Sequence, residues 1–186
     1  MHVHVRYHSG MATPILLHAC CGPCSTASIE RLLSEGWQPT IYFSNSNIFP
    51  ASEADKRFAE LLKVAGRYRL PVIREQYDHS AWRQAVAGHE ADPEHGERCT
   101  ICFRYNLAQA AAKARELGFK HFTTTLTVSR FKNSRTIFTV GQAFEGFEPI
   151  DFKKKDGFNR SIVLSKEMNL YRQEYCGCEF SLRDHS

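Results

Sequence analysis

Four short runs of apolar, β-branched or aromatic residues alternate with helical patterns along this chain, and this alternation limits its possible folds more than any other feature. The predicted strands span residues 13–19, 38–45, 71–76 and 121–128, and the predicted helices span residues 25–36, 52–67, 80–87, 101–117, 134–144 and 161–175. Strands joined by crossover helices of this length form a mainly parallel sheet that helices cover on both faces. The predicted fold class is therefore α/β.

The chain length fits one such domain, because 186 residues can bury a sizeable core without disulfide staples. Residues 1–11 precede the patterned sequence and are expected to form an N-terminal extension, which leaves residues 12–186 as a single α/β catalytic domain. No apolar run approaches the roughly 18 to 20 residues of a membrane helix, and residues 1–10 lack the apolar core of a signal peptide. We expect a cytoplasmic protein without a membrane partner.

The cysteines form three clusters, and no cysteine stands alone in the sequence: Cys20, Cys21 and Cys24; Cys99 and Cys102; Cys176 and Cys178. An odd number of cysteines without a secretion signal argues against a disulfide framework and indicates metal or redox chemistry. The first cluster follows the first predicted strand, at the edge where parallel sheets bind their ligands. The second cluster enters a predicted helix, and the third follows the last predicted helix. We expect all three clusters to meet at one rim of the sheet.

The C-x-x-C spacing of two cysteine pairs predicts metal ligation. "CTIC", residues 99–102, has this spacing, and so do Cys21 and Cys24. Four converging thiolates are typical of a [4Fe–4S] cluster, and they also form structural zinc sites. Zinc ribbons usually take their ligands from small β-knuckles, so a position at the rim of an α/β sheet favours iron. A disulfide between the adjacent Cys20 and Cys21 would be strained, and packing as small buried hydrophobic residues accounts for few of these thiols.

Cys176 and Cys178 flank a single glycine in "CGC", which allows the backbone a positive φ and a tight turn. A disulfide between these two thiols is expected to be strained, easily reduced and suited to carrying two electrons. Metal ligation by the pair is the alternative. An iron–sulfur cluster passes one electron at a time, so a neighbouring dithiol supplies the pair that a two-electron reduction needs.

Taken together, five segments resemble epoxyqueuosine reductases of the QueH type: "LLHACCGPCS", "NSNIFP", "ERCTICFRYNL", "SRFKNS" and "KKKDGFNRSIVLSKEMNLYRQEYCGCEFS". The resemblance extends from about residue 14 to residue 181, and "LYRQEYCGC" is its most specific part. It implies an enzyme without cobalamin that acts on tRNA. The enzyme would remove the epoxide oxygen of epoxyqueuosine at the wobble base to give queuosine, with electrons from a donor that the sequence does not identify.

The resemblance also implies roles for individual cysteines. It makes Cys20, Cys21, Cys99 and Cys102 the ligands of a [4Fe–4S] cluster and makes Cys176 and Cys178 the redox-active pair. The resemblance also allows an additional iron ion beside the cluster, and its candidate ligands are Cys24, Asp151 and Asp156. The role of Cys24 stays open, because spacing pairs it with Cys21 whereas the family pattern pairs Cys20 with Cys21.

The family fold resembles the nucleotide α-hydrolase (HUP) type, whose ATP-using members carry a phosphate loop rich in Gly and Ser after the first strand. Here "CCGPCS" occupies that place, with one Gly and a Pro that lacks an amide donor. ATP binding is therefore disfavoured, and we expect a metal site instead.

A formal net charge of +4 permits a polyanionic partner. Two expected loops near the rim, residues 129–135 and 152–160, combine basic and aromatic side chains, and the candidates for tRNA binding are Arg130, Lys132, Lys153, Lys154 and Lys155. His18 and Tyr175 are candidate proton donors, although a buried histidine at a strand end also fits simple packing. The Asn residues of 44–50 fit either the site or turn chemistry, and residues 88–98 are expected to be a solvated loop.

Two other functions fit parts of the same pattern. A zinc-stabilised RNA-binding protein would explain the thiols and the basic loops, and a thiol–disulfide oxidoreductase would explain the "CGC" pair. Iron with acid-labile sulfide separates the reductase from the zinc protein, and the oxidoreductase would work without any metal.

Overall fold

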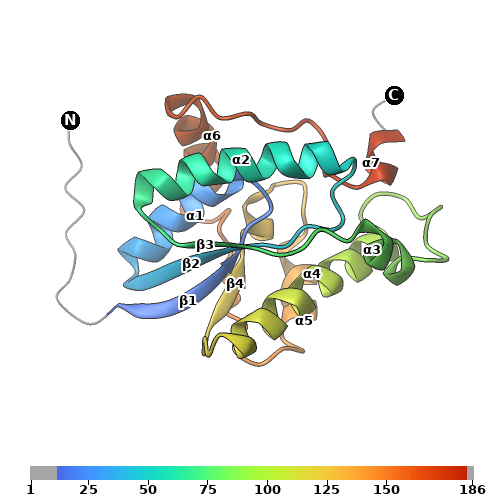
Figure 1. Ribbon diagram of the computed structural model, residues 1–186, viewed down its shortest axis with the longest axis horizontal. Helices are drawn as coiled ribbons and strands as arrows, with labels where there is room; N and C mark the ends of the chain where they lie inside the picture. The colour runs from blue at the N-terminus through green and yellow to red at the C-terminus, as the bar shows by residue number, and fades with distance from the viewer. Residues whose placement is uncertain (1–11, 184–186) are drawn as a thin grey trace.

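A four-stranded sheet whose strands all run parallel forms the centre of the fold (Figure 1), in a computed structural model that describes residues 12–183. The expected extension, residues 1–11, lies outside the described residues. The strands are β1 (Thr13–His18), β2 (Trp37–Phe43), β3 (Val72–Arg74) and β4 (Phe122–Thr124), in the order β3-β2-β1-β4. In the register of the sheet, Leu16 of β1 pairs with Thr40 on one side and Phe122 on the other.

Helices cover both faces of this sheet, as the alternation of the sequence predicts. α1 (Gly22–Ser34), α2 (Ala51–Tyr68) and α6 (Gly157–Glu167) lie on one side, and α4 (Glu97–Glu116) and α5 (Ser134–Gly141) lie on the other (Figure 1). Shorter elements complete the fold: α3 (His79–Ala85), the 3₁₀ helix η1 (Thr125–Val128) and α7 (Glu179–Arg183). Among the described residues, no helix has both the length and the apolar character needed to cross a membrane. The predicted α/β class is confirmed, and the architecture is consistent with the nucleotide α-hydrolase type.

The middle of the central strand β1, residues 15–17, is apolar because it is buried on both faces. Ile15 and Leu17 pack with residues of α1 and α2, whereas Leu16 packs on the opposite face with Phe103 and Leu107 of α4. Successive side chains of a strand point to opposite faces, so a strand in the middle of a two-sided core shows no polar alternation. The two cores hold the strand ends, and the loops that follow them, in fixed positions.

The structure corrects the predicted start of the first helix. The helix predicted from residue 25 is α1, which begins at Gly22, and its N-cap is Cys21, whose sulfur accepts the Cys24 N–H at 3.4 Å. Pro23 favours the early start, because proline suits the first turn of a helix. The Ser25 hydroxyl instead donates to the Cys21 carbonyl at 2.7 Å. Cys24 therefore lies in the first turn of α1, near the positive end of the helix dipole.

Two other predicted elements are shorter than expected. The strand predicted at 121–128 ends at Thr124, because its partner β1 ends at His18 and offers no further backbone groups to pair with. Residues 125–128 form η1, and the Thr124 side chain accepts the Leu126 N–H at its start. The helix predicted at 161–175 is α6, which starts earlier and ends at Glu167. Asn169, with φ of 48°, turns the chain there, and the segment up to residue 178 is irregular.

Candidate metal and redox site

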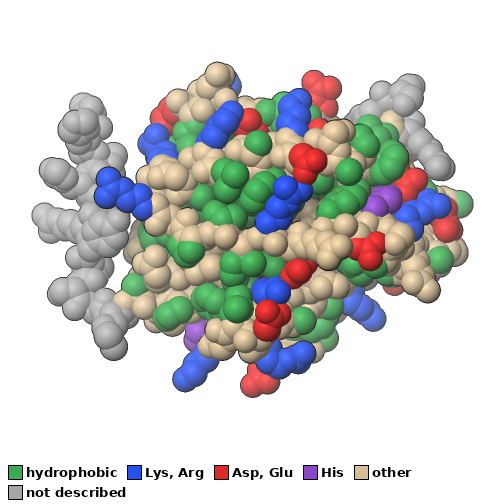
Figure 2. All heavy atoms as spheres, viewed as in Figure 1, with side chains coloured by type: hydrophobic (Ala, Val, Ile, Leu, Met, Phe, Trp, Pro, Cys, Tyr) green, Lys and Arg blue, Asp and Glu red, His purple; other side chains and the backbone are tan. Residues whose placement is uncertain are grey.

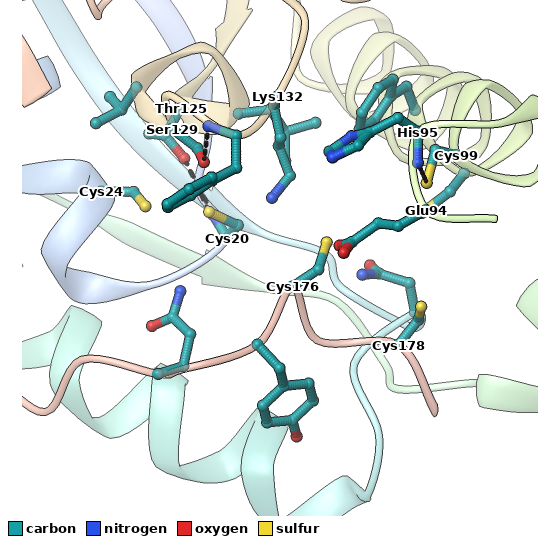
Figure 3. A pocket seen from close by; sticks show the side chains of 18 of the residues that line it. Cys20, Cys24, Glu94, His95, Cys99, Thr125, Ser129, Lys132, Cys176 and Cys178 are labelled. Atoms are coloured by element: carbon teal, nitrogen blue, oxygen red, sulfur yellow. Dashed lines mark hydrogen bonds between the residues drawn. The ribbon is translucent and has the colours of Figure 1, made fainter. Parts of the chain in front are cut away.

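A pocket of about 290 Å³ lies beyond the carboxyl ends of the central strands. β2 and β3 lie on one side of β1, and β4 lies on the other. The chain segments that follow β1 and its two neighbours therefore lead in opposite directions, which leaves a crevice at the carboxyl end of β1. Segments far apart in sequence meet in this crevice (Figure 3). Its lining includes six of the seven cysteines: Cys20, Cys24, Cys99, Cys102, Cys176 and Cys178. The three cysteine clusters thus meet at one rim, as the sequence predicts.

The first cluster gathers three thiols after β1. The sulfur atoms of Cys20, Cys21 and Cys24 lie within 4.8 Å of one another, and those of Cys20 and Cys21 are 3.9 Å apart. Cys21 is fully buried, and its sulfur also accepts the Gln173 Nε2–H at 3.4 Å. Hydrogen bonds from the Cys20 and Cys24 thiols hold the pKa of Cys21 well below its ordinary value, and the same contacts raise the pKa of those two thiols. The triad is a ready site for a metal cation, which would replace the shared protons.

The second cluster comes from the start of α4. Because α4 begins at Glu97, Cys99 and Cys102 are one helical turn apart and share a helix face. The Cys99 sulfur accepts the His95 N–H at 3.2 Å, and the Cys102 sulfur accepts an Asn106 Nδ2–H at 3.5 Å. Burial raises the pKa of both thiols. These two sulfurs do not belong to the triad of the first cluster, and they lie across the pocket from it.

The third cluster lies in a loop that is held by hydrogen bonds from Arg57 and Phe49. The buried Arg57 of α2 donates from Nη1 to the Cys176 carbonyl at 3.1 Å and pairs with Glu53 at 2.7 Å. The Phe49 N–H donates to the Gly177 carbonyl at 2.8 Å. The Cys176 thiol is directed into the pocket (Figure 3), whereas Cys178 packs with Trp82 and neighbouring apolar residues. Both cysteines are free thiols in the structure.

Gly177 is essential to this loop. Its φ is 133°, and a Cβ at this position would lie 2.9 Å from Arg57 Nη1 and 3.3 Å from Ile48 Cγ1. We predict that Gly177→Ala lowers the free energy of unfolding by about 1–3 kcal/mol, the cost of one strained backbone position. Displacement of Cys176 by about 1 Å is expected to cost on the order of 10²-fold in any reaction that uses its thiol.

Gly36→Ala is the matched control for this substitution. Gly36 also has a positive φ, of 85°, but nothing lies within 4 Å of its added Cβ. It should lose stability, measured by denaturant unfolding, with activity retained. Equal activity losses in the two variants would show that the Gly177 contacts do not position the dithiol.

Lys132 lines the same pocket, and its ammonium points to the space between Cys20 and Cys176 (Figure 3). Burial opposes the charged form, but the facing sulfurs of Cys176, Cys20 and Cys24 outweigh it and raise the pKa of Lys132. The side chain is thus a half-buried cation among thiols. A sequence pattern of alternating basic and aromatic residues does not reveal this orientation.

The other basic candidates differ in their surroundings. Lys153 is half-buried, and its ammonium donates to the carbonyls of Ser129 and Lys132 at 3.2 and 2.8 Å. Lys155 is exposed and pairs with Glu35 at 2.9 Å. Lys154 is exposed, and its ammonium has no partner within residues 12–183. Arg130 is exposed and stacks on aromatic rings next to the pocket.

The acidic and proton-donor candidates are engaged in hydrogen bonds within the fold, and of the four only Tyr175 lines the pocket. Asp151 and Asp156 lie outside the pocket lining: Asp151 Oδ1 accepts the Lys153 N–H, and Asp156 Oδ1 accepts from Asn159. His18 is buried, and its ring nitrogens bond the Thr124 hydroxyl at 2.9 Å and the Ser44 carbonyl at 3.1 Å. These bonds tie three strand ends together and use both ring nitrogens. The Tyr175 hydroxyl donates to the Phe49 carbonyl at 2.7 Å.

Several pocket residues escape sequence reasoning. The expected solvated loop, residues 88–98, contributes Glu94 and His95 to the lining, and the Glu94 carboxylate is directed into the pocket (Figure 3). Arg98 is buried and holds this loop through the Glu90 carbonyl at 3.0 Å. The two His and the acids of the loop have no regular spacing, so no pattern marks them. Asn47, from the segment 44–50, also lines the pocket and accepts an Asn106 Nδ2–H at 3.2 Å.

The fold and the site define an α/β protein whose pocket is built from thiols, as in metal-dependent and redox enzymes. Residues 15–184 match the family described as Epoxyqueuosine reductase QueH. The chain belongs to this family, whose members are oxidoreductases.

Relatives named "Epoxyqueuosine reductase QueH" support this assignment over nearly the whole chain. The relative from Haemophilus influenzae is 40% identical over 176 residues, which is 91% of this chain and 72% of the relative. The relative from Acinetobacter baylyi is 39% identical over 179 residues, 93% of this chain and 82% of the relative. The relative from Thermotoga maritima is 34% identical over 176 residues, 90% of each chain.

Proposed function

We propose that this protein reduces epoxyqueuosine in tRNA to queuosine, with a [4Fe–4S] cluster on Cys20, Cys21, Cys99 and Cys102 and a redox-active pair formed by Cys176 and Cys178. One observation carries the proposal: six cysteines line a single pocket, and the seventh, Cys21, lies within 4.8 Å of two of them. Because tRNA and reduced thiols both occur in the cytoplasm, we also propose that the protein works there.

The surroundings of four sulfurs fit an iron–sulfur cluster. Hydrogen bonds to the ligand sulfurs are a normal part of such sites and tune their potentials. Each of the four proposed ligands accepts one, and the donors are Thr125 Oγ1 to Cys20, the Cys24 N–H and Gln173 to Cys21, the His95 N–H to Cys99, and Asn106 to Cys102. Within residues 12–183 no N–H or hydroxyl group donates to the Cys24 sulfur. This contrast favours the family pairing of Cys20 with Cys21.

Cys24 fits better as a ligand of the additional iron. Its sulfur lies within 4.8 Å of those of Cys20 and Cys21. Cys24 belongs to the same triad and lines the pocket, unlike the two aspartate candidates. We therefore propose Cys24 as the protein ligand that an additional iron would recruit.

The chemistry balances with the dithiol as the reductant. Reduction of the epoxide removes its oxygen as water and leaves a carbon–carbon double bond, which takes two electrons and two protons. Cys176 and Cys178 release the same two electrons and two protons when they form a disulfide, so one dithiol supports one turnover. An external electron donor must then reduce the disulfide. The cluster, when bound, supplies one-electron transfer and Lewis-acid chemistry.

The chain's own residues orient and stabilise this reaction. Arg57 holds the Cys176 carbonyl, which keeps the Cys176 thiol directed into the pocket. Lys132 places a positive charge among the thiols, where it offsets the negative charge of bound thiolates and of the departing oxygen. Its role is thus inside the pocket rather than on a tRNA phosphate.

Metal analysis after anaerobic purification tests the proposal against its alternatives. We expect a brown protein with about four irons and matching acid-labile sulfide per chain, plus one further iron where the additional site is filled. Colourless protein with zinc alone would support the zinc-stabilised RNA-binding protein. Thiol–disulfide exchange activity in a metal-free protein would support the oxidoreductase instead.

The positive charge of the protein is not gathered on the face shown in Figure 2, where Lys and Arg side chains are interspersed with Asp and Glu. We expect contacts with tRNA phosphates from the basic segments 129–135 and 152–160. Of the basic candidates there, Lys154 is exposed without a partner among the described residues, whereas Lys153 is engaged by the 129–134 loop.

Salt dependence separates these two lysines. We predict that Lys154→Ala reduces the slope of log affinity for tRNA against log salt concentration by about 1, the loss of one phosphate contact. Lys153→Ala should keep the slope and reduce activity, because it releases the loop that carries Lys132. Filter binding at several salt concentrations gives the slope for each variant, and queuosine formation gives the activity. An unchanged slope in Lys154→Ala would remove this residue from the interface.

A further inference from the structure

The aromatic side chain of Phe131 sits at the pocket without the burial that such a side chain normally has. It is 65% exposed, the highest value among the large hydrophobic side chains within residues 12–183, and it lines the pocket. An exposed aromatic ring at the lining of a site is a common way to hold a flat ligand. The other exposed residues of this class do not line the pocket.

Phe131 belongs to a built arrangement of rings and charge. The Arg130 guanidinium carbon lies 5.0 Å from the centre of the Phe131 ring and 5.2 Å from the centre of the Phe158 ring. Phe158, at the start of α6, also lines the pocket. Arg130 thus bridges two aromatic rings from segments that are distant in the sequence.

The loop that carries Phe131 is fixed rather than free. Lys153 donates to the Ser129 and Lys132 carbonyls, which flank residues 130 and 131, and to the Ser134 hydroxyl at 2.6 Å. The Phe131 N–H donates to the Ser129 hydroxyl at 3.2 Å. Because these hydrogen bonds already hold the loop, a ligand that binds the exposed ring causes little further loss of conformational entropy. Such a ring is suited to ligand recognition.

We propose that Phe131, backed by Arg130 and Phe158, is a stacking platform for the nucleobase of the target nucleotide. This inference rests on the proposed function and names how the substrate is held. The epoxide-bearing ring is a substituent of the base, so when it reaches the thiols inside the pocket, the flat base remains nearer the mouth. Proteins bind splayed-out RNA bases by stacking them on aromatic rings and guanidinium groups, and Arg130 also brings a positive charge for the adjacent phosphate.

A double-mutant cycle between protein and RNA tests this platform, because it removes the Phe131 ring and the wobble base separately and together. The ring is removed by Phe131→Ala and conserved in character by Phe131→Trp. The base is removed by comparing an anticodon stem–loop RNA that carries epoxyqueuosine at the wobble position with the same RNA abasic at that position. Fluorescence anisotropy gives the dissociation constant of each combination, and the interaction between ring and base follows from the four values.

Wild-type protein should bind the abasic RNA about 5- to 150-fold more weakly, the range for one stacked base. Phe131→Ala should show a clearly smaller difference between the two RNAs, and Phe131→Trp should restore it. Leu117→Ala, at the far end of α4 and 45% exposed, is the control and should behave as wild type.

The outcomes also separate this inference from the proposed function. If Phe131→Ala retains the full wild-type difference between the two RNAs, or if wild type shows no difference, the platform is wrong. In either case, queuosine formation by the wild-type protein would leave the proposed function standing. If wild type neither binds nor reduces the epoxyqueuosine RNA, the proposed function itself fails.

Discussion

Cys176→Ser and Cys178→Ser are each expected to lower the rate of epoxyqueuosine reduction by on the order of 10³-fold or more, because each substitution removes one thiol of the two-electron reductant. The Cys176 thiol points into the pocket, and the buried Cys178, two residues further along, has its sulfur 3.6 Å from the Ser181 hydroxyl. Neither sulfur belongs to the triad of the first cluster. The iron and sulfide content should therefore stay at the wild-type level in both variants.

Product formation in a single turnover is the measurement for these variants. Excess chemical reductant should not rescue them, because the missing step is the transfer of an electron pair from the dithiol. Leu117→Ala, remote from the pocket, serves as the control for handling and folding. Normal turnover in either serine variant, with iron retained, would exclude the dithiol as the immediate reductant.

Cys21→Ser is expected to abolish binding of the iron–sulfur cluster, whereas Cys24→Ser is expected to retain it. Cys21 is fully buried at the helix N-terminus, where the positive end of the dipole favours a thiolate. The iron content of Cys21→Ser should fall from about four per chain to near zero, with loss of sulfide and of the brown colour. Cys24→Ser should keep sulfide and lose at most the additional iron.

The two variants are a matched pair, because the sulfurs are neighbours and the substitutions are identical. Cys99→Ser should repeat the result of Cys21→Ser from the other side of the pocket. Loss of sulfide in Cys24→Ser with retention in Cys21→Ser would reverse the assignment of these two ligands. Stoichiometric zinc with no sulfide in the wild-type protein would replace the cluster altogether.

The position of the cysteine clusters could be predicted because it depends on topology alone. Parallel strands place their carboxyl ends at one edge, so the turn after β1 and the start of α4 lie there, and the irregular segment after α6 brings Cys176 and Cys178 to the same edge. The residues that orient the thiols could not be predicted in this way. Arg57 reaches the Cys176 carbonyl from a helix 119 positions earlier in the chain, and no local pattern encodes that contact.

Local rules also failed where two of them compete. Ser25 satisfies the usual preference for an N-cap, yet Pro23 and the Cys21 sulfur start α1 three residues sooner. The β-branched run after Phe122 favours a strand, yet η1 forms because β1 has ended. The charge of Lys132 suggested a surface contact, and only the packed loop shows that its ammonium faces the thiols.

The most direct test of the account is nucleoside mass spectrometry of epoxyqueuosine-containing tRNA after incubation with the reduced, iron-loaded protein. We predict that epoxyqueuosine disappears and that an equal amount of queuosine, one oxygen atom lighter, takes its place. Unchanged epoxyqueuosine in the presence of protein that retains its iron, sulfide and free Cys176 and Cys178 thiols would contradict the account.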